Sequence, residues 1–445
     1  MSPDELTRLK MLSTKTLESL VTPDGIYASS ALGMEGLYHG YFGRDTAITA
    51  YLIAQAERIE DHQTFLINAV NGLVRLMEWQ STADNPQTGE EAGKFPHEIR
   101  LHEADYHHLT IDNITHGAKS WYVDPSDQVM KNWDSNDSTQ LWIIVVARLS
   151  EKGLITLDDR MKTALKKGLL WCLRNITEYD GLAGYRYHPE RKWAGLINQS
   201  WKDSEGAYLY ENGIAPAHPI KDIFVNALSW SALSYGARIF SEEDPELASL
   251  LTSQAATLKV RFNSSANGFL MYDLKSDYYF AEALDEDNHQ LQGVSCDAGL
   301  ALWAYCGDKS IIDDQYIPAV VKRLMMSDML DEEAGIRTYS CECSVFDPIG
   351  YHRGPHTYWP FVTGLIADGF NQFGYKNEAK TVLSAMVQGI KKFDTCVELF
   401  VKKDEVYSRF RHPSTEQVSC TDQAWTAGAL YYAANYLTLA AAEAI

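Results

Sequence analysis

The sequence predicts an all-α protein in which pairs of helices form a closed toroid. Apolar residues recur at steps of three and four over many stretches of the chain, which is the period of an amphipathic helix. Short and long connections alternate between these stretches, as expected when helical hairpins stand side by side and their long loops gather on one face. About twelve helices would make six such hairpins around a central funnel.

The helical pattern can be followed in order along the chain. We expect helices at residues 3–20, 45–59, 61–79, 139–151, 157–177, 220–240, 245–262, 296–306, 316–329, 355–373, 378–392 and 422–442. Many of them begin at or just after Ser, Thr, Asp or Pro, as capped helices do. The strand-like pieces 268–274 and 397–401 are short, and we expect them to form hairpins within loops.

The long connections carry the unusual residues. They span 81–136, 178–221, 263–295 and 330–356. No Pro-, Gly- or Ser-rich linker and no low-complexity tract marks a domain boundary. We therefore expect residues 1–445 to form a single domain whose loops and short β-hairpins build one functional face.

The charge of the chain excludes some classes of partner. Its 445 residues carry a formal charge of −21, from 39 basic and 60 acidic side chains. Such a surface repels nucleic acid and acidic membranes, whereas a neutral substrate is indifferent to it. Aromatic residues make up 11% of the chain, which fits either a large core or a carbohydrate cleft.

Neither a targeting segment nor a cofactor motif is apparent. The first ten residues are polar, and no stretch approaches the length of a membrane span. The seven cysteines are odd in number and irregular in spacing, which favours free thiols in a cytoplasmic protein. We expect no cofactor and no metal, since no Asp/Asn loop has calcium-ligand spacing. The sequence does not indicate an oligomeric state.

The stretch Asn198–Ser204 combines groups that suit a sugar. Trp201 offers an aromatic face, the flanking amides and hydroxyls can bind sugar hydroxyls, and Asp203 can handle a proton. Alternatively, Trp201 is a core residue and Lys202 with Asp203 is a solvated pair, although such a pair is worth little and would not explain the flanking amides. We interpret Asp203 as a general acid.

Three earlier pieces could contribute to the same site. Arg44 and Asp45 follow Tyr41 at a helix start, where Asp45 is either a helix cap or, with Arg44, a ligand of vicinal sugar hydroxyls. A second piece holds His97 and Glu98, which could equally be a surface ion pair. Asp137 precedes the apolar run 141–146, and the cap interpretation is at least as good as a substrate role.

Later pieces supply a wall and a second carboxylate. Tyr351, His352 and Arg353 lead into Trp359, and a pocket wall is at least as good an interpretation as a structural role for His352 and Arg353. Glu398 has apolar neighbours, which raise a carboxyl's pKa, and in a solvated cleft it could activate water. It could also be a strand residue that points to solvent. Glu416 is the competing candidate for the base, but its polar neighbours indicate a surface loop.

Together these motifs resemble a known group of enzymes. The set Y-F-G-R-D-T, F-P-H-E, D-S-T-Q-L-W, N-Q-S-W-K-D-S, Y-H-R-G-P, V-E-L-F and C-T-D-Q-A-W-T-A-G-A resembles the amylo-α-1,6-glucosidase domain of glycogen debranching enzymes. The H-R-G-P tract also suits the glucosylglycerate and mannosylglycerate hydrolases of the same clan. The resemblance implies an (α/α)6 barrel and an inverting mechanism.

The resemblance also implies residue roles. Asp203 would be the general acid and Glu398 the general base, although Val397 stands where the family has proline. Arg44 and Asp45 would hold the non-reducing sugar. The other substrate-binding residues that we expect are Tyr41, His97, Glu98, Asp137, Gln199, Trp201, Lys202, Tyr351, His352, Arg353, Trp359, Gln423 and Trp425.

The predicted activity is exo-acting release of one hexose, which we expect to be α-glucose. The chain has no room for the additional domains of full-length debranching enzymes, so a small glycoside or short oligosaccharide is the expected substrate. The alternatives are a glycerate-glycoside hydrolase and a sugar-binding toroid without catalysis. One physical problem stands out: a cation at Lys202 would favour ionised Asp203, unless burial or the field of Glu398 outweighs it.

Overall fold

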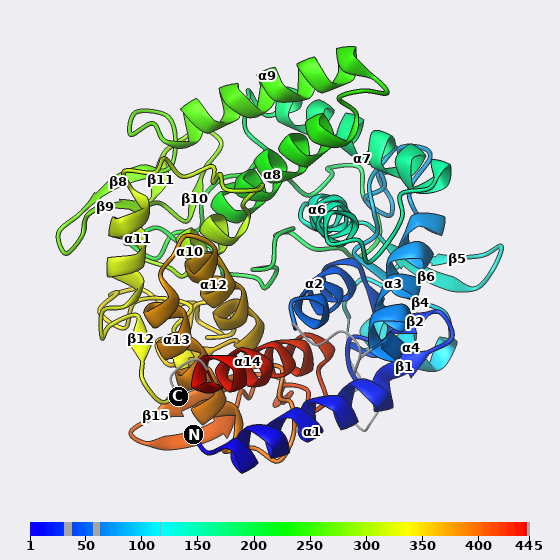
Figure 1. Cartoon of the computed structure of the whole chain (residues 1–445). Helices are drawn as coiled ribbons and strands as arrows, with labels where there is room; N and C mark the ends of the chain where they lie inside the picture. Colours follow the sequence, from blue (N-terminus) through cyan, green and yellow to red (C-terminus); the bar gives the residue numbers. More distant parts are fainter. Residues whose placement is uncertain (31–37, 57–62, 116, 443–445) are drawn as a thin grey trace.

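Six helices of the structure contact one another in a closed series. The computed structural model describes residues 1–30, 38–56, 63–115 and 117–442, and it is mostly helical. In the series, α2 packs on α6, α6 on α8, α8 on α10, α10 on α12, α12 on α14, and α14 on α2 again, around the centre of Figure 1. These inner helices are α2 (Gly43–Ala54), α6 (Ser138–Glu151), α8 (Ile223–Ile239), α10 (Asp297–Trp303), α12 (Pro360–Gln372) and α14 (Ala424–Ala442).

Six further helices lie outside this series. α1 packs on α14, α3 on α2, α7 on α6 and α8, α9 on α8, α11 on α10, and α13 on α12. They are α1 (Pro3–Leu20), α3 (Gln63–Glu78), α7 (Asp159–Glu178), α9 (Pro245–Phe262), α11 (Ile317–Leu324) and α13 (Lys376–Ile390). Figure 1 shows α1, α7 and α9 at the periphery, and the contact of α1 with α14 brings the two ends of the chain together.

Burial distinguishes the two sets of helices. Every residue of α2 is buried, and so is the run Ser138–Leu149 of α6, because inner helices are covered on all sides. In α7 the buried residues recur at three- and four-residue steps, from Met161 and Ala164 through Leu165, Gly168 and Leu169. The three- and four-residue period of apolar residues in the sequence therefore indicates the outer helices more clearly than the inner ones.

Several helix ends follow from local chemistry. The predicted helices 3–20 and 245–262 coincide with α1 and α9, and each has a proline in its first turn. The side chains of Ser2 and Asp244 accept hydrogen bonds from the backbone N–H groups of Glu5 and Leu247. The remaining ten helices are also present. Positions 57–59 and 61–62 of two predicted helices lie outside the described residues.

The prediction of helix 355–373 places its start too early. α12 begins at Pro360, because Thr357 and Tyr358 form a strand that pairs with Phe400 and Val401. The long loops also contain three short helical pieces that the sequence does not predict: α4 (Glu103–His107), a π-helical turn at His108–Asp112 and α5 (Asn113–Thr115).

Small antiparallel sheets accompany the helices, and some of them have three or four strands where the sequence predicts only short β-hairpins. The sheets have the strand orders β1-β2, β3-β4-β6-β5, β11-β10-β7, β8-β9, β12-β13 and β14-β15-β16. The strands are β1 (Val21–Thr22), β2 (Gly25–Ile26), β3 (Tyr41–Phe42), β4 (Glu98–Arg100), β5 (Val123–Asp124), β6 (Val129–Asn132), β7 (Lys221–Asp222), β8 (Leu270–Asp273), β9 (Asp277–Phe280), β10 (Ala283–Leu284), β11 (Gln290–Leu291), β12 (Leu330–Asp331), β13 (Gly335–Ile336), β14 (Thr357–Tyr358), β15 (Phe400–Lys403) and β16 (Val406–Arg409).

The two strand-like pieces of the sequence lie in such hairpins. The piece 268–274 contains β8, which pairs with β9. The piece 397–401 runs into β15, which pairs with β16 through a turn at Asp404 and Glu405. Both turn residues have positive φ, 49° and 62°, as a tight hairpin turn requires.

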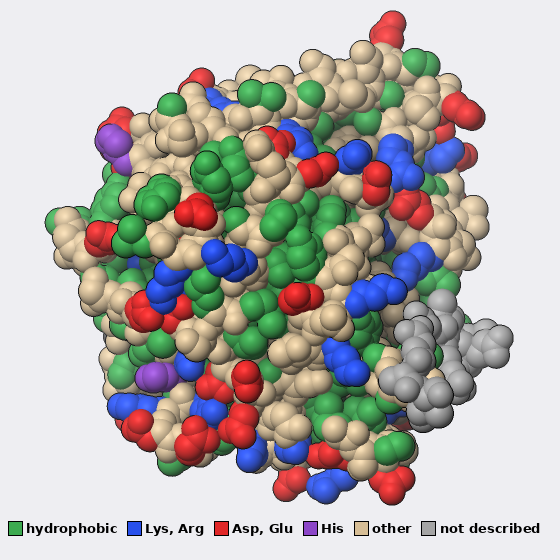
Figure 2. Space-filling model, turned by 60° about the vertical axis from the view of Figure 1, so that its left-hand side comes forward, with side chains coloured by type: hydrophobic (Ala, Val, Ile, Leu, Met, Phe, Trp, Pro, Cys, Tyr) green, Lys and Arg blue, Asp and Glu red, His purple; other side chains and the backbone are tan. Residues whose placement is uncertain are grey.

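The surface and the core have distinct compositions. The largest cluster of buried hydrophobic side chains extends from Leu6 to Leu437. On the face shown in Figure 2, acidic and basic side chains are interspersed, with hydrophobic side chains exposed between them. Within the described part of the chain, no helix is long and apolar enough to span a bilayer, and no group of His, Cys, Asp and Glu side chains could hold a metal ion. The seven cysteines all lie in the described part of the chain, and none of them forms a disulfide.

Candidate active site

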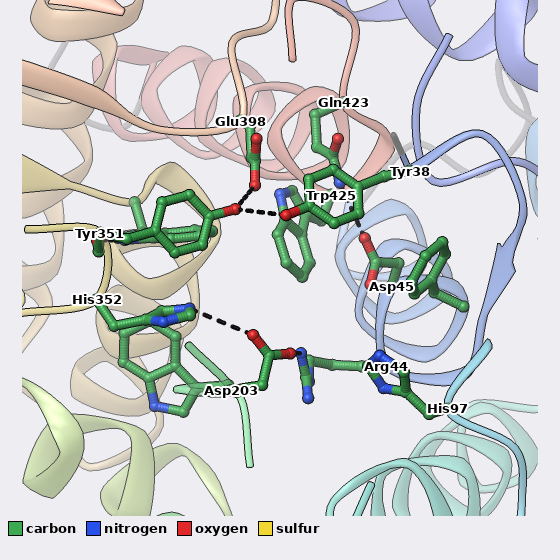
Figure 3. A pocket seen from close by; sticks show the side chains of 13 residues that line it. Tyr38, Arg44, Asp45, His97, Asp203, Tyr351, His352, Glu398, Gln423 and Trp425 are labelled. Atoms are coloured by element: carbon green, nitrogen blue, oxygen red, sulfur yellow. Dashed lines mark hydrogen bonds and ion pairs between the residues drawn. The ribbon is translucent and has the colours of Figure 1, made fainter. Parts of the chain in front are cut away.

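A pocket of about 370 Å³ opens where inner helices of the ring begin. Residues at or just before the first turns of α2, α12 and α14 contribute to its wall, and loops supply the rest (Figure 3). Its lining consists of Tyr38, Phe42, Arg44, Asp45, His97, Trp201, Asp203, Tyr351, His352, Trp359, Glu398, Gln423 and Trp425. Eleven of these thirteen are residues that the sequence motifs predict for the site.

Asp203 lies on one side of the pocket, with 23% of its side chain exposed. Its Oδ2 accepts a hydrogen bond from Arg44 Nη1 at 3.0 Å, and its Oδ1 lies 3.9 Å from His352 Nε2. Burial raises the pKa of Asp203, Arg44 acts against that rise, and the nearby charge of Asp137 adds to it. The net result is a raised pKa, which favours the protonated acid.

Glu398 lies on the other side of the pocket, opposite Asp203 in Figure 3. Its Oε1 accepts a hydrogen bond from the Tyr351 hydroxyl, and its Oε2 accepts one from the backbone N–H of Cys420 at 3.1 Å. Burial raises the pKa of Glu398 to about 7, although both hydrogen bonds lower it. The Tyr38 hydroxyl lies 3.1 Å from that of Tyr351 and extends this chain of polar groups.

The two candidates for the second carboxylate have different surroundings. Glu398 is buried and lines the pocket, whereas Glu416 is exposed and pairs with Arg411 at 2.9 Å. Glu416 therefore has no position from which it could reach a molecule in the pocket, and Glu398 is the carboxylate that faces Asp203.

Arg44 is held mainly by protein groups. Its Nε donates to Asp137 Oδ2 at 2.7 Å, its Nη2 to the backbone oxygen of Ser200 at 2.7 Å, and its Nη1 to Asp203. Few of its five N–H groups are left for a ligand. Arg44 lines the pocket as expected and also positions Asp203. The expectation for Asp137 needs correction, because Asp137 does not line the pocket but anchors Arg44. Although Asp137 stands at the N-cap position of α6, its side chain makes no capping bond.

The inner end of the pocket carries polar atoms without partners. Asp45 Oδ1 accepts a hydrogen bond from Gln423 Nε2 at 2.9 Å, and burial raises the pKa of Asp45 to about 8. Among the described residues, His97 Nδ1, Gln423 Oε1 and Trp425 Nε1 are buried and have no hydrogen-bond partner. Burial and Arg44 hold the pKa of His97 well below its usual value, so its ring is neutral. Unsatisfied buried polar atoms at one place need an explanation, and a hydroxylated ligand supplies one.

Aromatic rings form the rest of the wall. His352 stacks on Trp359 with ring centroids 5.1 Å apart, and Trp201 and Trp425 each lie 5.9 Å from Trp359 edge to face. Trp201 is fixed from behind, since its Nε1 donates to Asp297 Oδ1 at 2.7 Å. Flat apolar faces beside hydrogen-bonding groups suit a sugar ring.

Lys202 turns away from the neighbouring Asp203. Its side chain is fully buried, and its Nζ bonds Glu282 Oε2 at 2.9 Å and the carboxylate of Asp297. These two acidic groups neutralise the lysine. The cation that contacts Asp203 is Arg44, and burial outweighs it. The expectation that Lys202 lines the pocket is therefore wrong, and the cation that burial has to outweigh at Asp203 is Arg44 rather than Lys202.

Four other predicted residues lie outside the pocket lining. The Tyr41 hydroxyl bonds Thr22 Oγ1 at 2.7 Å on the other side of β3. The remaining three are buried elsewhere: Glu98 pairs with Arg100, Gln199 bonds backbone oxygens of its own loop, and Arg353 bonds the backbone oxygen of Leu209 and the Tyr339 hydroxyl. They support the walls without contacting the cavity.

Tyr38 and Phe42 line the pocket but are not among the site residues that the motifs predict. Phe42 stands next to Tyr41 in the quoted motif, and successive strand residues point to opposite faces. The alternation therefore requires that one of the two faces the pocket, but it does not say which. Tyr38 lies just upstream in an aromatic-rich stretch, which is the only signal that could have indicated it.

Comparisons with known proteins identify the kind of fold. A family model described as the mannosylglycerate hydrolase MGH1-like glycoside hydrolase domain matches residues 207–400, which include Glu398 but begin after Asp203. No curated protein matches the sequence.

Among solved structures, a GH63 mannosylglycerate hydrolase from Thermus thermophilus in complex with Tris is 14% identical, with a TM-score of 0.59, 95% of this chain covered and 99% of that chain. The same enzyme in complex with glucose is 15% identical, with the same TM-score and coverage. A glycosidase variant in complex with glucose is 12% identical, with a TM-score of 0.57 and 99% of both chains covered. The family match and the shared fold support a six-hairpin glycosidase and hence a glycoside hydrolase. They do not extend to the glycogen debranching enzymes in particular.

Proposed function

We propose that this protein is an inverting, exo-acting glycoside hydrolase that releases a single hexose from a small glycoside or oligosaccharide. One observation carries the proposal: Asp203 and Glu398, far apart in the sequence, lie on opposite sides of the same aromatic pocket. Inverting hydrolysis requires a protonated carboxyl at the leaving oxygen and a carboxylate behind a water on the other face of the sugar.

The proposed reaction assigns one step to each carboxyl group. Asp203 donates its proton to the glycosidic oxygen as the bond from that oxygen to the anomeric carbon breaks. Glu398 accepts a proton from a water whose oxygen bonds the anomeric carbon from the opposite face. The products are the free leaving group and a hexose of inverted configuration. Afterwards Glu398 holds a proton and Asp203 lacks one, and exchange with solvent restores both.

The electrostatics support these roles. The raised pKa of Asp203 favours an acid that carries its proton. The pKa of Glu398, about 7, leaves a substantial fraction of it ionised at neutral pH. The hydrogen bonds from Tyr351 and from the Cys420 N–H stabilise that anion and aim its two oxygens.

The inner end of the pocket supports exo action on one sugar unit. Asp45, the neutral His97 and the unpartnered atoms of Gln423 and Trp425 offer donors and acceptors for hydroxyls. We propose α-glucose for this position, in line with the resemblance of the motifs to amylo-α-1,6-glucosidases.

A second candidate function is hydrolysis of mannosylglycerate or glucosylglycerate. The specific observation that favours it is the family match over residues 207–400. This reaction would use the same fold and the same two carboxyl groups. It differs in the leaving group and, for mannosylglycerate, also in the hexose. A sugar-binding toroid without catalysis is the remaining alternative, and the presence of both carboxyl groups in one pocket argues against it.

We further infer that the chain forms one (α/α)6 barrel over residues 1–445. The closed series of inner helices and the outer helices packed on them support this inference, as does the hydrophobic cluster from Leu6 to Leu437. In such a barrel the loops before the inner helices gather at one end, which is where the pocket lies.

The test combines two variants with a stereochemical measurement. Asp203→Asn and Glu398→Gln should each abolish turnover of α-glucosides and α-mannosides while sugar binding, measured by calorimetry, persists. NMR of the first product formed by the wild type should show the β-anomer from an α-glycoside. Wild-type rates in either variant, or retention of configuration, would contradict the proposal.

A further inference from the structure

A second cavity adjoins the proposed catalytic pocket. This outer chamber has a volume of about 770 Å³ and shares Tyr38, Asp203, Tyr351 and Glu398 with the inner pocket. Its other lining residues are Leu196, Ser204, Glu205, Ile349, Phe410, His412, Gln417, Val418 and Ser419. Both candidate catalytic carboxyl groups therefore stand at the border between the two spaces.

That position gives the outer chamber a role in the proposed reaction. A glycosidic bond that lies between Asp203 and Glu398 would have its hexose in the inner pocket, beside Asp45 and Gln423. The leaving group would then extend into the outer chamber. The chemistry of the chamber wall accordingly selects the leaving group.

The charged groups of the chamber are unfavourable for an anion. Asp203, Glu205 and Glu398 contribute carboxyl groups, and no Lys or Arg is among the described residues that line it. The two arginines of the adjoining hairpin do not line the chamber, and both bond protein groups: Arg411 pairs with Glu416 at 2.9 Å, and Arg409 donates to the backbone oxygen of Ser419 at 3.2 Å. Asp203 is uncharged while it holds its proton, so a glycerate carboxylate would meet the carboxylate of Glu205 and the ionised form of Glu398, without a Lys or Arg of the lining to bind it.

The imidazole in the chamber is positioned by its own loop. His412 Nδ1 accepts hydrogen bonds from the backbone N–H groups of Ser414 and Thr415 at 3.2 and 3.1 Å. This leaves Nε2 as the ring nitrogen that can donate a hydrogen bond to a hydroxyl of the leaving group.

The remaining wall fits an uncharged ring. Phe410 is largely buried and lies 5.1 Å from the ring of Tyr351, next to the apolar side chains of Leu196, Ile349 and Val418. Polar groups of Ser204, Gln417 and His412 are interspersed with these. An apolar face with scattered donors and acceptors matches a pyranose, which has an apolar face and a rim of hydroxyls.

We propose that the outer chamber is a leaving-group subsite for an uncharged second sugar and that it discriminates against glycerate. This inference rests on the proposed glycosidase function and specifies its substrate class: a neutral disaccharide or short oligosaccharide. It separates this chain from the mannosylglycerate hydrolase named by the family match, although the two share a fold.

Matched substrates isolate the charge of the leaving group. α-Glucosylglycerol and α-glucosylglycerate differ only in a hydroxymethyl group against a carboxylate, and the corresponding α-mannosides form a second pair. In whichever pair the protein hydrolyses, glucosides or mannosides, we expect kcat/KM to be at least about tenfold higher for the glycerol glycoside than for the glycerate glycoside. We also expect hydrolysis of isomaltose. Added salt should narrow the gap, because it screens the repulsion. Equal or faster hydrolysis of the glycerate glycoside would overturn the inference.

Two variants locate the effect in the chamber. Glu205→Lys should raise kcat/KM for the glycerate glycoside relative to the glycerol glycoside by about tenfold, since it replaces a repelling charge by an attracting one. The control Glu242→Lys makes the same charge change at an exposed residue just after α8 and should leave the ratio unchanged. Phe410→Ala should lower kcat/KM for isomaltose more than for glucosylglycerol. An unchanged ratio in Glu205→Lys would contradict the assignment.

Failure of the proposed glycosidase function can be distinguished from failure of the inference about the outer chamber. If the wild type hydrolyses no member of the panel, the glycosidase proposal is wrong, and calorimetric binding of the same pairs then decides the inference. Tighter binding of the neutral member supports the assignment of the chamber. Tighter binding of the glycerate member, equal binding, or no binding of either overturns it.

Discussion

Arg44 Nη1 donates a hydrogen bond to Asp203 Oδ2 over 3.0 Å and so links the first turn of α2 to a loop 159 residues further along the chain. The other edge of the same guanidinium holds Asp137 at 2.7 Å. Arg44 therefore lies between Asp137 and Asp203, and Arg44 and Asp137 affect the pKa of Asp203 in opposite ways. It lowers the pKa of Asp203, whereas the charge of Asp137 raises it, on top of the larger rise that burial causes.

This arrangement predicts opposite pH shifts from two neighbouring substitutions. Arg44→Gln should raise the pKa of Asp203 further and move the alkaline limb of the kcat/KM profile to higher pH, because the acid keeps its proton longer. Asp137→Asn should move that limb to lower pH. We expect shifts of about one pH unit. If Arg44→Gln and Asp137→Asn shifted the alkaline limb in the same direction, that limb would not result from the titration of Asp203. The double variant shows whether an unpaired Asp137 disturbs folding.

The hydroxyl of Tyr351 predicts a change in the acidic limb. Its hydrogen bond lowers the pKa of Glu398, which burial holds at about 7. Tyr351→Phe should raise that pKa by about one unit, so that the base is protonated over a wider range and the acidic limb moves to higher pH. Tyr38→Phe is the matched control, since Tyr38 bonds Tyr351 and not Glu398. An acidic limb that stays in place in Tyr351→Phe would exclude Glu398 as its origin.

The helices could be predicted from the sequence because their signal is local. Periodic apolar residues and prolines in first turns determine α1 and α9 at both ends. The start of α12 could not be predicted, because Pro355 and Pro360 both suit a first turn. Thr357 pairs with Val401 in a sheet, so Pro355 lies outside the helix and α12 begins at Pro360.

The motifs in the sequence predict which residues belong to the site, but not how their side chains are arranged in space. Asp203 and Glu398 come from quoted motifs and do meet in one pocket. The partners of Lys202 could not be foreseen, because Glu282 and Asp297 lie 80 and 95 residues away and carry no motif of their own. The choice between Tyr41 and Phe42 depends on the register of β3 with β4, which a single strand does not reveal.

The raised pKa of Glu398 predicts a cost in stability at neutral and alkaline pH. The folded-state pKa of about 7 lies above the usual 4.5, so the folded protein binds the extra proton between these values and loses stability as the pH rises through them. Glu398→Gln removes this loss. Relative to wild type, its free energy of unfolding should rise by about 3 kcal/mol between pH 4 and pH 8, as measured by urea denaturation. Glu416→Gln, at an exposed residue, should show no such trend.

The buried cluster around Lys202 predicts a structural role for this residue. Lys202→Met would leave Glu282 and Asp297 without their shared cation in a fully buried place, and removing one partner of such a cluster costs about 3–5 kcal/mol. Urea denaturation should show this loss, while the pH profile of any remaining activity keeps its alkaline limb, because Lys202 does not contact Asp203. The double variant Lys202→Met, Asp297→Asn should recover much of the stability, since Glu282 keeps Arg353 Nη2 as a partner at 3.5 Å. A stable single variant with a shifted alkaline limb would instead assign Lys202 to the control of Asp203.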